Sequence, residues 1–234
     1  MLYLYLYLIK GWIAINIRMI TPHISVNFKF DDNSVAWLNE NLTKIITDFD
    51  RDFPEEGGPI YNKEVAGSMK FQLTPPAIQV RKFLLSLGLK KVHIQMFCYK
   101  VSDKATVMEN VHIDNPESIP LPSRFNIMVS GNNNSKMHWW DIDVNDPRVV
   151  ATDIPNWGKR WQIPGGNAQE QLTVIGNPDY SASELSSVQQ TGDFVRTDIA
   201  HCIERDGARR ILVSAQIHHP WEEITEKVLQ WKNQ

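Results

Sequence analysis

The sequence predicts a mainly β domain with flanking helices. From Lys91 onward, seven short runs rich in β-forming residues follow one another without a helical pattern between them, and clusters of Gly, Asn, Pro and Asp separate them. Such a series is typical of a sandwich, a jelly roll or a barrel. The 234 residues are 42% hydrophobic, which suffices for the core of one domain. The runs are VHIQMFCYKV, ATVMENVHI, RFNIMVSG, KMHWWDIDV, QLTVIG, DFVRTDIAHCIE and RRILVSAQIH.

Helical patterns precede and follow this β-rich region. After a short strand at 24–30, Asp32-Asn33-Ser34 offers helix caps, and apolar residues then recur at helical spacing. Pro75-Pro76 opens a second helix, which Gly88 ends. The tail at 220–234 begins with Pro and carries Glu in its first turn, so it predicts a closing helix.

These patterns divide the chain into a support and a core within one domain. We expect residues 20–90 to form a helical support, 91–219 the β core and 220–234 a C-terminal helix. Residues 1–19 are apolar, but Lys10 leaves no uncharged run of the roughly 18–20 residues that a membrane helix needs. They also lack the charge pattern and cleavage site of a secretory signal. We expect them to be a non-native or disordered extension, with a strand as the alternative.

Charge and cysteine content limit the partners and the compartment. The chain has 24 basic and 27 acidic residues, a net charge of −3, and therefore no basic surplus of the kind that nucleic-acid binding requires. The two cysteines, Cys98 and Cys202, are too few for a disulfide framework or a Cys-rich zinc site. We therefore expect a cytoplasmic protein that binds neither nucleic acid nor membranes.

A His-x-Asp pair stands at the end of a predicted strand. Because alternate side chains leave a strand on the same face, His112 and Asp114 point together and can share a metal ion. Such a pair on its own is more often polar surface.

A second polar cluster near the carboxyl end of the chain supports a metal site at this pair. His201 lies in a strand-like run, a Glu-Arg-Asp-Gly turn follows, and Arg210 and Ser214 share one face of the next strand. A buried guanidinium requires an anionic partner, and its geometry matches a carboxylate. Two histidines and one carboxylate on one face of a β-barrel form the facial triad of non-haem iron(II) oxygenases.

In these segments the chain resembles the iron(II)- and 2-oxoglutarate-dependent oxygenase superfamily. The resemblance covers residues 91–218 and is carried by Tyr99, by VHID, by RFNIMV and by GDFVRTDIAHCIERDGARRILVS. The last segment is similar to the aspartyl/asparaginyl β-hydroxylase-like branch and to related small bacterial or phage branches.

The resemblance implies a double-stranded β-helix core, of the jelly-roll or cupin-like type, and a hydroxylase. In such an enzyme His112, Asp114 and His201 bind Fe(II), and Arg210 with Ser214 binds 2-oxoglutarate, the co-substrate used together with dioxygen. The substrate class would be a peptidyl side chain or a small amino-acid-like molecule.

One position departs from the pattern of the superfamily. Many members carry Ser two residues after the arginine, where this chain has Leu212. Arg209 is therefore an alternative anchor if the strand register slips by one residue. Arg210 is favoured because Ile211 and Val213 then face an apolar layer.

Further candidates flank this pocket. Tyr99, Arg124 and Asn126 fall on predicted strands and could contact co-substrate or substrate, or serve structural hydrogen bonds instead. His138, together with Asp141 and Asp143, offers a rival metal cluster. Of the tryptophans Trp139, Trp140, Trp157 and Trp161, core packing is expected over a substrate groove.

Residues 145–170 read as a long loop with three prolines, and loops of this length are often functional lids.

Two other classes of function stay open at this point. One is a cupin-type metal enzyme that needs no oxoacid, and the other is a catalytically silent β-sandwich that binds glycans or protein.

Overall fold

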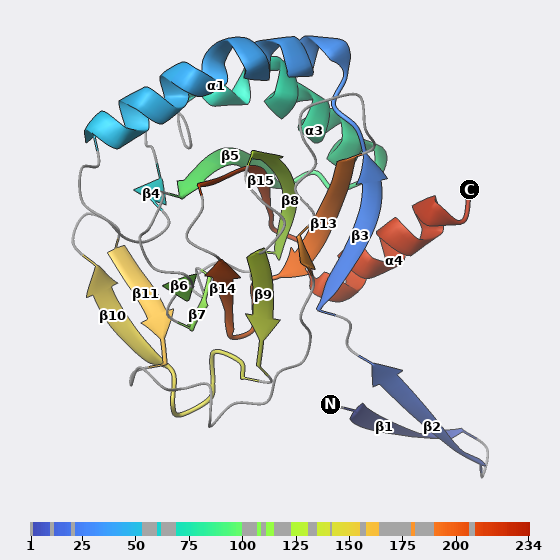
Figure 1. Ribbon diagram of the computed structural model, residues 1–234. Helices are drawn as coiled ribbons and strands as arrows, with labels where there is room; N and C mark the ends of the chain where they lie inside the picture. Colours follow the sequence, from blue (N-terminus) through green and yellow to red (C-terminus); the bar gives the residue numbers. More distant parts are fainter. Residues whose placement is uncertain are drawn as a thin grey trace.

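The computed structural model describes fourteen stretches of the chain, and Figure 1 presents their arrangement. They are residues 2–9, 12–19, 22–52, 60–61, 69–99, 107–108, 111–114, 123–130, 135–140, 142–154, 158–163, 179–180, 190–205 and 209–234. The helices are α1 (Asp32–Asp52), α2 (Met69–Gln72), α3 (Pro75–Ser86) and α4 (Trp221–Lys232). The strands are β1 (Leu2–Ile9), β2 (Trp12–Met19), β3 (His23–Phe28), β4 (Ile60–Tyr61), β5 (Val92–Tyr99), β6 (Val107–Met108), β7 (His112–Ile113), β8 (Ser123–Ser130), β9 (Ser135–Trp139), β10 (Val150–Ile154), β11 (Gly158–Gln162), β12 (Asp179–Tyr180), β13 (Gln190–Arg196), β14 (His201–Arg205) and β15 (Arg210–Ile217).

Two antiparallel sheets form the body of the protein. The described residues give a six-stranded sheet in the order β3-β13-β8-β15-β5-β4 and a seven-stranded sheet in the order β10-β11-β7-β14-β9-β12, with β6 also paired to β14. Strands β7, β9 and β14 belong to one sheet, while β8, β13 and β15 belong to the other, so the chain crosses between the sheets repeatedly. The predicted mainly β class with flanking helices is confirmed, and this interleaving is consistent with a jelly-roll-like fold.

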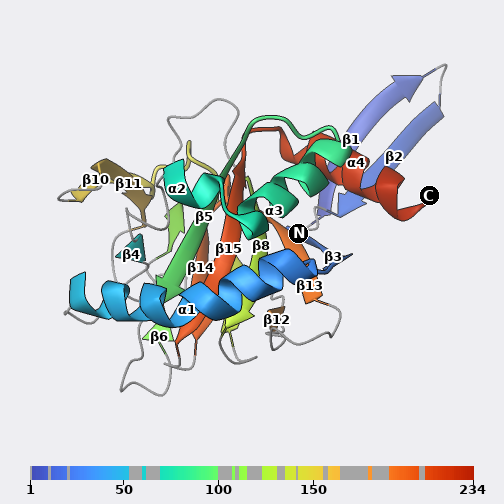
Figure 2. The same ribbon diagram turned by 90° about the horizontal axis from the view of Figure 1, so that it is seen from above.

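Helices α1, α3 and α4 lie on the outer face of the six-stranded sheet (Figures 1 and 2). The alternation along β15 explains why. Ile211 and Val213 belong to the apolar cluster that includes helix residues such as Leu84, whereas Leu212 lies in a second apolar cluster between the sheets. Strand β15 therefore buries both of its faces, one against the helices and one against the opposite sheet.

The helix boundaries follow their local chemistry. The cap of α1 is Asp31, one residue before the expected cluster, because its Oδ1 accepts a hydrogen bond of 2.8 Å from the backbone N–H of Ser34. Helix α3 starts at Pro75, as predicted. Gly88 ends it with a φ of 76°, a conformation that L side chains rarely adopt.

Two β-rich regions differ from the sequence-based expectation. The run 193–204 is two strands, β13 and β14, which lie in different sheets because the chain turns between Arg196 and His201. Part of the expected loop at 145–170 is a hairpin, in which β10 pairs with β11 and β11 continues onto β7. The prediction of a structureless loop was wrong there, since its short β-forming runs find an edge strand to extend.

Other expected segments lie partly or wholly outside the described residues. The predicted strand at 171–176 is one of these, and so are 155–157 and 164–170 of the expected lid. For residues 1–19 the strand alternative holds: β1 and β2 form an antiparallel pair that Figure 1 places beside the body of the protein, and this pair joins neither of the other sheets within the described residues. None of the described helices has the length and apolar character needed to cross a membrane.

Gly192 on β13 marks a close approach that tests the packing of the helix-covered face. A Cβ atom at this position would run into the ring of Phe125, which is fully buried. We expect Gly192→Ala to lower the free energy of unfolding by about 1–3 kcal/mol, as overpacking does, measured by urea denaturation. In the background of Phe125→Leu the same change should cost less, because the shorter side chain leaves room. Wild-type stability of Gly192→Ala would contradict this packing.

Candidate metal centre

The seven-stranded sheet brings the three predicted ligands together. His112 on β7 and His201 at the start of β14 are directly paired residues of neighbouring strands. Asp114 follows β7, and its backbone N–H donates a hydrogen bond of 3.0 Å to the carbonyl oxygen of Thr197. The approach to β14 therefore fixes the end of β7, and with it the direction of the carboxylate.

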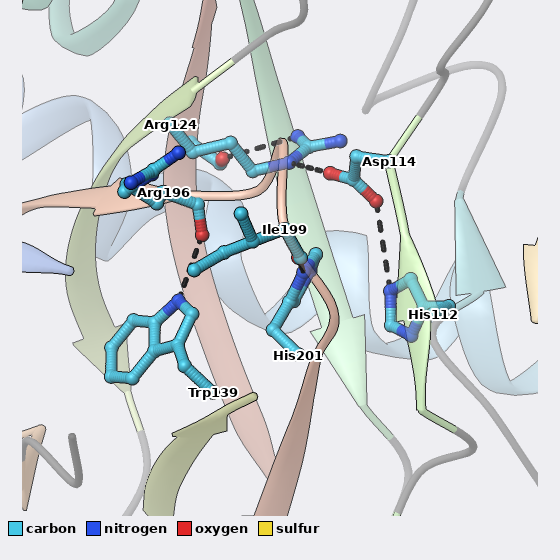
Figure 3. Close-up of polar contacts among 8 residues, drawn as sticks. His112, Asp114, Arg124, Trp139, Arg196, Ile199 and His201 are labelled. Atoms are coloured by element: carbon cyan, nitrogen blue, oxygen red, sulfur yellow. Dashed lines mark hydrogen bonds and ion pairs between the residues drawn. The ribbon is translucent and has the colours of Figure 1, made fainter. Parts of the chain in front are cut away.

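The three side chains present their ligand atoms to one point. One ligand atom from each of His112, Asp114 and His201 lies within 4.8 Å of the other two. The two imidazole rings are 4.5 Å apart between centroids, and His112 Nε2 is 3.6 Å from Asp114 Oδ1. Both histidines are buried, with 8% and 3% of their surface exposed. This is a buried group that could bind a metal ion (Figure 3).

A backbone contact selects the tautomer of His201. Its Nδ1–H donates a hydrogen bond of 2.9 Å to the carbonyl oxygen of Ile199. The lone pair is then on Nε2, which is the form of imidazole that binds metal ions. The local chain thus orients the ring before any ion is present.

Arg124 holds the carboxylate of Asp114 from the opposite sheet. Its Nε donates to Asp114 Oδ2 at 2.6 Å, and its guanidinium also reaches Ser214 Oγ at 3.4 Å and lies over the ring of Phe97 at 5.0 Å. Figure 3 places Arg124 on one side of the carboxylate and His112 on the other. The sequence-based candidate Arg124 therefore contacts a predicted metal ligand directly.

The charge on Asp114 is secured by this neighbour. Burial on its own raises the pKa of Asp114, but the positive charge of Arg124, with smaller contributions from His201 and His112, holds that pKa well below its usual range. The carboxylate is therefore ionised at neutral pH, as a metal ligand must be.

The two adjacent arginines separate to opposite faces of β15. Arg210 is buried between the sheets with 1% exposed, and its guanidinium lies 5.3 Å from the centre of the Tyr99 ring. Arg209 instead faces α1, where its NH2 forms an ion pair of 2.8 Å with Asp50. The favoured register, with Arg210 inward and Ile211 toward the helices, is the one that the structure adopts.

A transverse row of polar side chains runs across the inner face of the six-stranded sheet. Ser214 pairs with Gln95 on one side and with Asn126 on the other, and Asn126 pairs in turn with Asp193. Buried Oδ1 of Asn126 has no hydrogen-bond partner among the described residues. Polar atoms in such a place are usually satisfied, so this row is a candidate binding surface.

Asp193 is a member of this row that sequence reasoning missed. It is buried, and the Oγ of Ser25 donates a hydrogen bond of 2.5 Å to it. Burial raises its pKa, while the bond from Ser25 and the charges of His23 and Arg210 work in the other direction. Its position two residues from Val195, on the inward face of β13, was the available signal.

The rival cluster around His138 does not assemble in the part of the chain that the structure describes. His138 Nε2 lies 2.9 Å from Glu204 Oε2, and the ring stacks on Trp140. Asp143 accepts a turn hydrogen bond from the backbone of Asn145, and residue 141 lies outside the described residues.

The environment of the tryptophans and of Cys202 follows the expected pattern. Trp139 and Trp140 are buried, as core packing requires, Trp161 is partly buried, and residue 157 lies outside the described residues. Cys202 belongs to an apolar cluster together with Trp140, as alternation along β14 requires of the residue after His201.

Comparison with known proteins adds no family to these observations. No protein-family profile matches the chain, and no curated protein matches it in sequence. The site therefore rests on the residues themselves.

The ion pair of Asp114 predicts how stability depends on pH. Because the folded-state pKa is lowered, the pair stabilises the metal-free fold above the unfolded pKa of about 4, and this contribution is lost as the pH falls toward the folded value. Asp114→Asn should lower the free energy of unfolding at pH 7 by about 3–5 kcal/mol, because Arg124 stays buried beside a neutral group. The gap to wild type should narrow below pH 4.

Urea denaturation between pH 3 and 7 in the presence of a chelator measures this dependence. Asp48→Asn is the matched control, since it removes an Asp–Arg pair, with Arg51, that lies on the exposed surface of α1 and should change stability little. A pH-independent gap between wild type and Asp114→Asn would refute the assigned charge state.

Proposed function

We propose that this protein is an iron(II)- and 2-oxoglutarate-dependent dioxygenase that hydroxylates a peptidyl side chain or a small amino-acid-like substrate. The observation that carries the proposal is the buried group of His112, Asp114 and His201. Two imidazoles and one carboxylate leave half of an octahedral coordination sphere open, which is the ligand set of non-haem iron(II) oxygenases.

The strand order supports a double-stranded β-helix as the finer description of the fold. Eight strands, β5, β7, β8, β9, β12, β13, β14 and β15, divide four and four between the two antiparallel sheets. Within the sheets they take the orders β13-β8-β15-β5 and β7-β14-β9-β12, so strands from the two halves of the chain alternate. This is how a jelly roll closes two Greek keys around one interior.

The donor set fits a divalent iron ion. Nitrogen from neutral imidazole and oxygen from an ionised carboxylate suit Fe(II), and both are prepared by their neighbours, through Ile199 for His201 and through Arg124 for Asp114. When bound, the iron would supply activation of dioxygen, coupled to conversion of 2-oxoglutarate to succinate and carbon dioxide and to insertion of one oxygen atom into a substrate C–H bond.

Arg210 is the residue that would bind the far carboxylate of 2-oxoglutarate. It is a buried cation on the inner face, in the same interior as the triad, and Tyr99 lies against it. Ser214 lies on β15 four residues from Arg210, and Asn126 is paired with it on β8. Both side chains would hydrogen-bond the co-substrate. The guanidinium supplies charge complementarity that a monocarboxylate could not fully use.

The apolar cluster around this row would keep water from the reaction. Phe97, Met128 and Leu212 fill the space between the sheets beside the polar side chains. A dry interior strengthens electrostatic interactions and protects reactive species from side reactions. We retain 145–170 as the segment that would cover the substrate, with β10 and β11 anchoring it to β7.

The compartment and the partners follow from the same sequence features. Cys98 and Cys202 are buried and are not disulfide-bonded, which fits a reducing, cytoplasmic environment. A small molecule or peptide is the proposed substrate, and the acidic balance of the chain argues against nucleic acid.

Metal binding provides the first test. His112→Ala and His201→Ala should each lose at least tenfold in Fe(II) affinity, measured anaerobically, and should lose substrate-stimulated turnover of 2-oxoglutarate, because each change removes a ligand. His138→Ala is the control, since that histidine is paired with Glu204 outside the triad and should leave both properties intact. Full turnover in both triad variants would defeat the proposal.

The adjacent arginines provide the second test. Arg210→Ala should weaken binding of 2-oxoglutarate at least tenfold, since loss of a charged hydrogen bond costs roughly 1.5–3 kcal/mol, whereas Arg209→Ala should leave it unchanged. The readout is anaerobic titration of the iron-loaded protein, followed by the visible charge-transfer band of the chelated oxoacid. Equal effects of Arg210→Ala and Arg209→Ala on 2-oxoglutarate binding would refute the role of Arg210. Formation of succinate separates this enzyme from a cupin-type enzyme that needs no oxoacid.

A further inference from the structure

The predicted metal centre carries no net charge of its own. Its two histidines are neutral when they act as ligands, and the one carboxylate, on Asp114, is already matched by the guanidinium of Arg124 at 2.6 Å. A divalent cation placed there would therefore keep its full charge inside the sandwich. Buried charge is costly unless an opposite charge accompanies it.

Arg124 cannot move away from the ion without breaking other contacts. Its side chain is 12% exposed, and besides Asp114 it contacts Ser214 on β15 and the ring of Phe97 on β5. Arg124 itself is on β8, so its contacts with β15 and β5 join three neighbouring strands of the six-stranded sheet. The positive charge is therefore a fixed part of the site rather than a mobile surface group.

Arg210 is a second buried cation on the inner face of the six-stranded sheet. The carboxylate of Asp193, on the same face, is one acidic group that lies within reach of its charge. The remaining arginine near the site, Arg196, forms its own ion pair of 2.6 Å with Asp198. Nothing in this arrangement of described charges offers a divalent cation more than the single carboxylate that Arg124 already binds.

We propose that Arg124 couples metal binding to the binding of a dianion: it weakens the site for the metal ion alone and makes tight binding depend on a dicarboxylate that enters with the ion. This inference rests on the proposed metal centre. A dianion brings two negative charges, which offset the two positive charges of the ion. Arg124 is a positioning residue for Asp114 in geometry, but its charge sets the thermodynamic linkage between the two ligands.

Equilibrium binding of Mn(II), an oxygen-stable substitute for iron, tests the linkage. The dissociation constant is measured by electron paramagnetic resonance of free Mn(II), without anion and with saturating 2-oxoglutarate, for wild type, Arg124→Gln, Arg124→Lys and Arg209→Gln. Gln can still donate a hydrogen bond to Asp114 but carries no charge. Lys keeps the positive charge but lacks the planar guanidinium group with its several donors. Arg209→Gln removes an arginine on the helix-covered face.

In wild type, 2-oxoglutarate should tighten Mn(II) binding by at least about tenfold, within the usual range of coupling between sites. Arg124→Gln should bind Mn(II) alone several-fold more tightly than wild type, with a coupling factor several-fold smaller. Arg124→Lys and Arg209→Gln should keep the wild-type coupling. A purely structural role for Arg124 would not move the coupling factor in this way.

Three results would overturn the proposal. Equal weakening of Mn(II) binding by Arg124→Gln, with and without the anion, would reduce Arg124 to a geometric support. Loss of coupling in Arg124→Lys would show that the geometry of the guanidinium group, not its charge, links binding of the metal ion to binding of the anion. Absence of any Mn(II) binding to wild type would refute the metal centre itself and the inference with it, and so distinguishes the two failures.

Circular dichroism establishes whether each variant is folded. If Arg124→Gln is not, wild type alone decides the matter by comparison of 2-oxoglutarate with pyruvate, a monoanion with the same chelating group. After correction for the affinity of each anion for Mn(II) in solution, the dianion should tighten Mn(II) binding several-fold more than the monoanion. Equal effects of the two anions would overturn the proposal.

Discussion

The ion pair between Asp114 and Arg124 is the contact on which the candidate site depends, because it joins the two sheets at the point where the triad forms. Asp114 follows β7 of one sheet, and Arg124 lies on β8 of the other. Two unit charges about 4 Å apart attract by only about 4 kcal/mol at an effective dielectric constant of about 20. Removing each ion from water costs several kcal/mol. The pair therefore gains little net stability, and its value lies in fixing the direction and charge of one carboxylate.

The same reasoning applies to the polar row on the inner face of the six-stranded sheet. The interior of a jelly roll can be filled entirely with apolar side chains. Here the apolar cluster that contains Phe97 and Leu212 fills part of it. A row that instead contains Ser214, Asn126 and Asp193 gives up hydrophobic burial on neighbouring strands at one level of the sheet. Such a loss is expected where the interior must receive a polar ligand rather than exclude one.

Local rules predict part of the candidate site, whereas His201 is added to it by resemblance to a known family pattern. The spacing of His112 and Asp114 places them on one face of a strand, and the apolar alternation of Ile211 and Val213 selects Arg210 over Arg209 as the inward arginine. Contacts between sheets follow no such rule. The partner of Arg124 could not be derived, because β7 and β8 are neighbours in sequence but lie in different sheets.

Two further differences have the same physical origin. The pairing of β11 with β7 depends on the edge that β7 offers, and no property of the proline-containing segment itself indicates that edge. Asp193 looks like one more acidic residue in a strand until Ser25 on β3 is placed beside it. Period and capping rules therefore recover elements and facing residues, whereas the charges that tune the site depend on which strands become neighbours.

The environment of Asp114 explains how the candidate metal site can be stable without an ion. Ligand sets with several carboxylates repel one another without their ion, and the empty site then tends to open or to protonate. Here the charge of the single carboxylate is balanced by Arg124, and the ring of His201 is held by its hydrogen bond to the carbonyl oxygen of Ile199. Stability of the empty site and strong binding of a bare ion are opposing demands on the same charge. In the proposed enzyme, a ligand that brings its own negative charge would resolve them, which would tie the choice of co-substrate to Arg124.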